Sequence, residues 1–108
     1  MSDYLFIQSQ DPFTETRSAQ QYALATQLRD AGHGVRLLLV QNGVTAARKG
    51  ARCPHFDQAL QSGLEVIADD FSLQQREIAN GEIKEPVSVG GIALAIDALL
   101  AGHKVIWN

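Results

Sequence analysis

Short, almost wholly apolar segments alternate along this chain with segments of helical periodicity, and this alternation constrains the fold more than any other feature. The apolar segments lie at residues 4–7, 35–40, 64–68 and 105–107. Strands that lack polar alternation are buried on both faces, which is typical of a parallel sheet covered by helices on both sides. We therefore predict a three-layer α/β/α fold with a mostly parallel sheet of four to five strands.

Apolar residues between these strands recur at helical spacing. We expect helical segments in five places, at residues 16–31, 44–49, 54–61, 71–78 and 92–101. In the last of these, Ile92, Ala95, Ile96, Leu99 and Leu100 share one face. Glycine, proline and charge over 80–90 indicate a surface loop with a short extended piece near Val87. A chain of 108 residues has the size of one domain, and we expect a single domain over 1–108.

Charge and cysteine content argue against several classes of protein. The net charge of −3 does not suit a nucleic-acid partner, which needs a basic face. A lone cysteine forms no internal disulfide, and no apolar run approaches the ~20 residues of a membrane helix. The start, Met-Ser-Asp-Tyr, lacks the cationic and apolar segments of a signal peptide. We expect a cytoplasmic protein that binds neither nucleic acid nor a membrane.

No cofactor or metal is expected from the motifs. No grouping of His, Cys, Asp and Glu has metal-site spacing, and neither the P-loop nor the dinucleotide-binding pattern is present.

Polar residues follow the predicted strands where each one ends. Because the carboxyl ends of parallel strands lie at one edge, where open α/β folds place their sites, we expect Ser9, Asn42, Gly43 and Asp69 to line that edge. These residues form a candidate site for a small ligand or a nucleotide. The neighbouring Asp69 and Asp70 raise a third possibility, an acid/base site. Adjacent strand residues point to opposite faces, however, and helix capping explains at least one carboxylate.

Cys53 lies in a loop whose charges favour a reactive thiol. Arg48, Lys49 and Arg52 precede it, and His55 follows it by two residues. Nearby cations and the start of a helix both lower the pKa of a thiol. We take Cys53 as a candidate catalytic thiol or persulfide, with Arg48 and Arg52 as binding residues beside it. The alternative is a neutral cysteine among solvated cations.

A family resemblance is carried by the stretch GHGVRLLLVQNGVTAA, residues 32–47. It is similar to the strand-and-turn segment of the DsrE/DsrF/DsrH family, small sulfur-relay proteins that include the TusB, TusC and TusD subunits. The segments VIADDFSLQQREI and IDALLAGHKVIWN also resemble that family, and Thr45-Ala46-Ala47 is most similar to its DsrH/TusB branch. The resemblance implies a DsrE-like fold, a homo-oligomer or a hetero-oligomer with related subunits, and sulfur transfer as a cysteine persulfide with a sulfur-carrier protein.

The chain departs from this family at the thiol. DsrE- and TusD-like members carry the persulfide cysteine at the end of the third strand, where this chain has Asp69. The DsrH branch has a cysteine near the start of its first helix, where this chain has Ala19-Gln20-Gln21, and Cys53 matches no family motif. We therefore expect an oligomeric subunit of sulfur relay with a regulatory or structural role, and at most a sulfur carrier that uses Cys53. The alternative is a small-ligand or nucleotide-binding module without thiol chemistry on the same fold.

Overall fold

The structure is a computed structural model that describes residues 2–108, so Met1 of the expected domain lies outside the described residues. Its elements follow in this order: β1 (Asp3–Gln8), α1 (Arg17–Asp30), β2 (Gly34–Leu39), the 3-10 helix η1 (Gln41–Ala47), α2 (Pro54–Gln61), β3 (Glu65–Asp69), α3 (Asp70–Gln75), the 3-10 helix η2 (Asn80–Glu82), β4 (Ser88–Gly90), α4 (Ala93–Leu100) and β5 (Lys104–Trp107). Among residues 2–108, no helix has the length and apolar character needed to cross a membrane.

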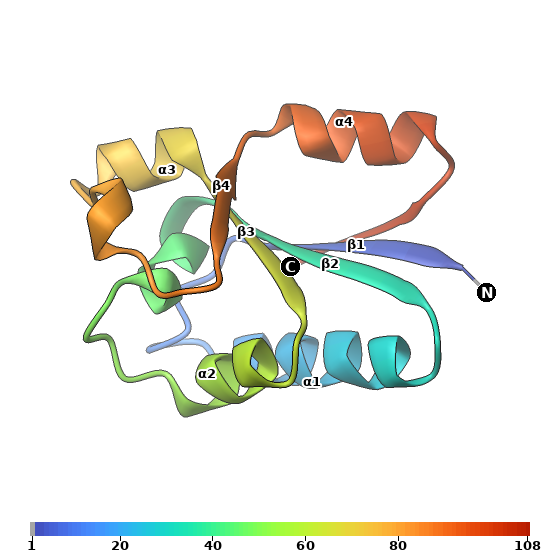
Figure 1. The fold of residues 1–108 in the computed structure, drawn as a ribbon, viewed down its shortest axis with the longest axis horizontal. Coiled ribbons are helices and arrows are strands. Elements are labelled where there is room, and N and C mark those ends of the chain that lie inside the picture. The colour runs from blue at the N-terminus through green and yellow to red at the C-terminus, as the bar shows by residue number, and fades with distance from the viewer. Residues whose placement is uncertain (1) are drawn as a thin grey trace.

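The five strands form one parallel sheet in the order β4-β3-β2-β1-β5. Helices α1 and α2 lie on one side of the sheet and α4 on the other, which gives three layers (Figure 1). The prediction of a three-layer α/β/α fold with a parallel sheet is confirmed. One element differs in type and position: the helix expected over 44–49 is a 3-10 helix that already begins at Gln41, so the Asn-Gly dipeptide lies inside it.

Alternate residues of the strands face two separate cores. The core on the side of α1 and α2 contains an edge-to-face aromatic pair, Tyr22 and Phe56, whose ring centroids are 5.5 Å apart. The core on the other side is smaller, and strand residues such as Leu38 pack there against Ala95 and Ala98 of α4. Two apolar faces on every central strand explain why the strand sequences lack polar alternation.

Helix α4 turns its small residues to the sheet and its large apolar residues outward. Ala95 and Ala98 are buried, whereas Leu100 is 83% exposed. We call the exposed apolar surface on this side of the molecule the outer face of α4; it consists of Ile92, Ile96, Leu99, Leu100 and, at the end of β5, Trp107. Of the five helix residues expected to share a face, only Ala95 is buried against the sheet. A helix that is apolar all round is typical of a buried position.

Candidate functional site

The carboxyl ends of β1, β2 and β3 lie side by side, because these strands are parallel neighbours. Ser9 follows β1, Asn42 and Gly43 lie in η1 directly after β2, and Asp69 is the last residue of β3. The structure therefore places these four predicted residues at one edge of the sheet. Their side chains and backbones do not converge on a single centre, since each has a different partner.

Asp69 is held as a helix cap. It is only 8% exposed, and its Oδ2 accepts hydrogen bonds from the backbone N of Ser72 at 2.9 Å and from Ser72 Oγ at 2.6 Å. Ser72 Oγ in turn accepts a hydrogen bond from the backbone N of Gln41 at 2.8 Å. The Asp69 carboxylate thus connects β3, α3 and the start of η1. Asp70 is exposed, and its Oδ2 accepts a hydrogen bond from Gln74 Nε2 at 3.2 Å. Within residues 2–108 the two aspartates share no hydrogen-bond partner, which does not suit an acid/base pair.

Ser9 and Gly43 have structural partners as well. Ser9 Oγ and Ser9 N each donate a hydrogen bond to the carbonyl oxygen of Asn108 at 2.9 Å. Gly43 is buried, and a Cβ at this position would collide with the carbonyl oxygen of Gln8. Glycine is required there by the close approach of two backbone segments. Both positions hold the edge of the sheet together.

Cys53 immediately precedes α2 and carries a free thiol that is only 6% exposed. Burial raises the pKa of the Cys53 thiol; the backbone hydrogen bond from Phe56, at the start of α2, and the charge of Lys84 both lower it, but they offset the rise only in part. The prediction that the surrounding charges lower this pKa is therefore wrong. Arg48 and Lys49 border a surface hollow, and Arg52 is exposed, while the sulfur belongs to the core beneath α1 and α2.

Lys84 is a residue that sequence reasoning missed. Its Nζ donates hydrogen bonds to Asp57 Oδ1 at 2.7 Å and to the carbonyl oxygen of Ala51 at 2.8 Å, and it lies 5.5 Å from the centroid of the Phe56 ring. These contacts fasten the loop before β4 to α2 near Cys53. The linear sequence gives no sign of them, because Lys84 is 27 residues away from Asp57.

A hollow of about 750 Å³ opens at the same edge of the sheet, and we call it the cationic hollow. Its walls come from the loop after β1, from η1 and the loop that follows it, and from the end of α3; they consist of Asp11, Phe13, Asn42, Thr45, Arg48, Lys49, Gly50, Ala51 and Arg76. It includes two of the predicted binding residues, Asn42 and Arg48, but not Ser9, Gly43, Asp69 or Arg52. Arg76 was not predicted, although its position after α3 places it near this edge.

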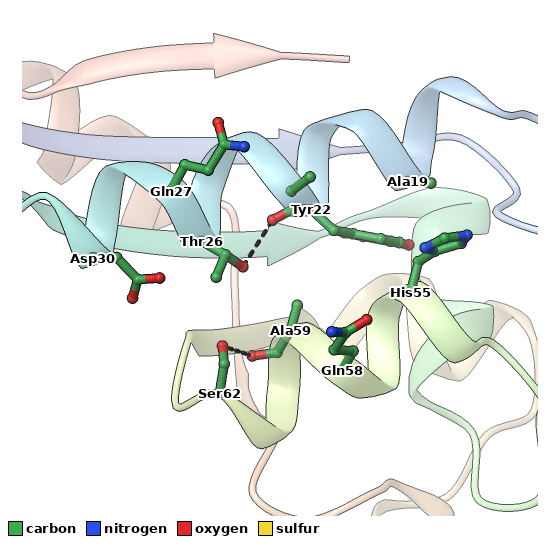
Figure 2. Close-up of a pocket in the computed structure, with 10 residues that line it drawn as sticks. Ala19, Tyr22, Thr26, Gln27, Asp30, His55, Gln58, Ala59 and Ser62 are labelled. Carbon is green, nitrogen blue, oxygen red and sulfur yellow. Dashed lines mark hydrogen bonds between the residues drawn. The ribbon is translucent and has the colours of Figure 1, made fainter.

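A second cleft of about 410 Å³ lies between α1 and α2 and contains none of the predicted site residues. Figure 2 shows the Tyr22 ring extending toward His55 across this cleft. The Tyr22 hydroxyl is buried without a hydrogen-bond partner among residues 2–108, and burial raises its pKa. The hydroxyls of Thr26 and Ser62 donate to carbonyl oxygens of their own helices, as the dashed lines in Figure 2 mark. Within residues 2–108, no three His, Cys, Asp or Glu side chains gather as metal ligands would.

Known proteins identify the family of this chain. The sequence model of the DsrE/DsrF-like family matches residues 2–107. Among solved structures, the fold is similar to the ychN protein from E. coli, with a TM-score of 0.87 and 20% identity, and to MTH1491 of unknown function from Methanobacterium thermoautotrophicum, with a TM-score of 0.86 and 15% identity; both likenesses cover 100% of each chain.

A third structure, BT1422 of unknown function from Bacteroides thetaiotaomicron, has a TM-score of 0.72 and 18% identity, over 98% of this chain and 95% of that one. No curated protein sequence matches the chain. The structural likenesses support the fold, and the sequence model extends over nearly all the described residues. The chain belongs to the DsrE/DsrF-like family.

Proposed function

We propose that this chain is an oligomeric subunit of intracellular sulfur relay whose contribution is structural or regulatory. The sulfur-relay part of this proposal is based on membership of the DsrE/DsrF-like family, which is associated with sulfur relay. The resemblance of Thr45-Ala46-Ala47 to the DsrH/TusB branch supports a place near that branch. We place the protein in the cytoplasm, where the family generally acts.

The observation that carries this proposal is the state of Asp69. A carboxylate forms no persulfide, so the end of β3 does not carry sulfur in this chain. Both hydrogen bonds to its Oδ2, from Ser72 N at 2.9 Å and Ser72 Oγ at 2.6 Å, give Asp69 a structural role instead. The position that the family uses for chemistry therefore serves here to fix α3 against η1.

Cys53 is the one thiol of the chain, and its surroundings favour a structural role over sulfur transfer. A sulfur-carrying thiol reacts as a thiolate and must be reachable by its partner. Cys53 is 6% exposed, and its burial raises its pKa, so the thiol form predominates at neutral pH. Sulfur transfer through Cys53 is the competing role, and the experiment below separates the two.

Oligomer formation is supported by the outer face of α4. Four large aliphatic side chains and Trp107 are exposed together on one side of the sheet, which is covered there by α4 (Figure 1). Contiguous exposed apolar surface of this kind marks interaction sites in soluble proteins. A second copy of this chain or a related subunit, docked on this face, removes the exposed apolar surface from water.

The sulfur-carrier role is tested by intact-mass measurement. The protein and its C53S variant are incubated with a low-molecular-weight persulfide, whose sulfane sulfur passes to an accepting thiolate and leaves the donor as a thiol. We expect neither protein to gain the mass of a sulfur atom under native conditions, while wild type unfolded in urea does. Native wild type that gains one sulfur, with no gain in C53S, contradicts the structural role and makes Cys53 the carrier.

A further inference from the structure

The cationic hollow has a charge opposite in sign to that of the chain. Arg48, Lys49 and Arg76 line it together with one carboxylate, Asp11, which leaves an excess of two positive charges. The chain as a whole has a net charge of −3. An anion is therefore attracted by the local positive charge of the hollow, whereas the negative net charge of the protein repels it.

Among residues 2–108, no carboxylate forms an ion pair with any of the three cations. The salt bridges formed within residues 2–108 join Arg29 to Asp30, Lys84 to Asp57 and His103 to Asp3, all outside the hollow. The carboxylate of Asp11 is engaged in its own turn, where its Oδ1 accepts a hydrogen bond from the backbone N of Phe13 at 2.8 Å. The positive charge in the hollow is thus left for a ligand.

The guanidinium of Arg76 is held in a fixed orientation at the wall of the hollow. Its Nε and Nη2 donate to Asn42 Oδ1 at 3.1 and 3.0 Å, and its Nη1 donates to the carbonyl oxygen of Ser72 at 3.1 Å. A guanidinium has five N–H groups, so two remain available on Nη1 and Nη2. Arg48 Nη2 donates to the carbonyl oxygen of Arg76 at 3.3 Å, which keeps the two arginines together. Guanidinium N–H groups are the donors that oxyanions such as phosphate commonly accept from in proteins.

The hollow is also larger than an inorganic anion requires and has an aromatic wall. Its volume of about 750 Å³ lies in the range of pockets for organic ligands. Phe13, which is 52% exposed, supplies a flat apolar surface beside the cations. We propose that the cationic hollow binds a small organic molecule with a tetrahedral oxyanion, a phosphate or sulfate ester, whose organic part packs on Phe13. This site does not depend on the proposed role in sulfur relay.

The proposal is tested by NMR titration of the ¹⁵N-labelled protein with phenyl phosphate, and in parallel with phenyl sulfate, pyrophosphate and uncharged benzyl alcohol. We expect saturable amide shifts at residues 42–51 and 76 with the two esters, weaker binding of pyrophosphate, and none with benzyl alcohol. The ester with the greater affinity identifies phosphate or sulfate as the preferred group. Affinity should fall as salt is added, because the cations are open to solvent.

Charge variants provide the controls. The double variant R48Q/K49Q should lower the affinity at least about ten-fold, because it removes two ion contacts. D11N should raise it, since the amide keeps the acceptor for Phe13 N and loses the repelling charge. K49Q and K104Q form a matched pair, because each removes one positive charge. Lys104 begins β5 at the opposite edge of the sheet, so the affinity of K104Q should stay within about two-fold of the wild-type affinity.

Two results would overturn the proposal. One is the absence of saturable shifts with either ester up to about 10 mM, a concentration ten-fold above a dissociation constant of about 1 mM. The other is equal weakening by K49Q and K104Q, which would show that the anion senses only the overall charge. Neither result bears on the outer face of α4 or on Cys53, so a failure here is distinct from a failure of the proposed function.

Discussion

Replacement of Gly43 by alanine is expected to destabilise the protein strongly, because the backbone of η1 crosses directly against the end of β1. A Cβ at Gly43 collides with the carbonyl oxygen of Gln8. That oxygen accepts a hydrogen bond from the backbone N of Val40 at 3.0 Å, which joins the ends of β1 and β2. The collision is with main-chain atoms, so no side-chain rotation relieves it.

The size of the destabilisation follows from the separation of the two backbone segments that the new Cβ requires. Separating the two backbones weakens the Val40–Gln8 hydrogen bond, worth about 1 kcal/mol, and overpacking strain adds roughly 1–3 kcal/mol. Restriction of the unfolded chain by alanine returns about 0.4–1 kcal/mol. We therefore expect Gly43→Ala to lower the free energy of unfolding by about 1–3.5 kcal/mol.

Urea unfolding followed by far-ultraviolet circular dichroism measures this loss, with Gly81→Ala as the matched control. Gly81 lies in η2, and a Cβ there has nothing within 4 Å. The control should change the free energy of unfolding by less than about 0.5 kcal/mol. Equal stability of the two variants would refute the argument that steric contact with Gln8 requires glycine at position 43, and would return Gly43 to the set of candidate ligand-binding residues.

Three further predictions test the interface, the cap and the thiol. Leu100→Asp on the outer face of α4 should shift the protein to a smaller species in light scattering, whereas Leu24→Asp, an exposed leucine on α1, should not; an unchanged mass for both contradicts the interface. Asp69→Ala should lower the free energy of unfolding by about 1–2 kcal/mol through loss of the cap, and Asp70→Ala by less than half of that; similar losses would count against the cap. Because burial raises the pKa of Cys53, the folded state holds the thiol proton more tightly than the unfolded chain does. Stability should therefore fall as pH rises above about 8.5, and less steeply in Cys53→Ala; identical pH profiles would contradict the shift.

The fold was predictable because it depends on patterns that are local in sequence. The apolar runs that form β1, β2 and β3 can be recognised without knowing which strands they pair with. Helical spacing between these runs indicates that helices connect the strands, as a parallel sheet requires. The orientation of α4 was less accessible. Its residues are apolar on nearly every side, so periodicity identifies the helix but does not select the face that meets the sheet.

Positions in the candidate site were predictable only for residues whose place follows from the sheet topology alone. Parallel strands place Asn42 and Asp69 at one edge, and this holds in the structure. The pKa of Cys53 depends instead on tertiary packing: burial of the sulfur raises it, Arg48 borders the hollow, and Lys84, from a distant segment, opposes the rise only in part. Counting charges along the sequence therefore gives the wrong direction for the pKa of this thiol.

The position of β1 in the sheet has a consequence for how the sheet is completed during folding. β1 pairs with β2 on one side and with β5 on the other, and the backbone after β1 bonds to Asn108. During folding, β1 therefore keeps one open edge until residues 104–107 have paired with it. Open edges template pairing with other chains. Until β5 docks, the inner strand β1 therefore offers an unpaired edge to other chains, and docking of β5 closes it.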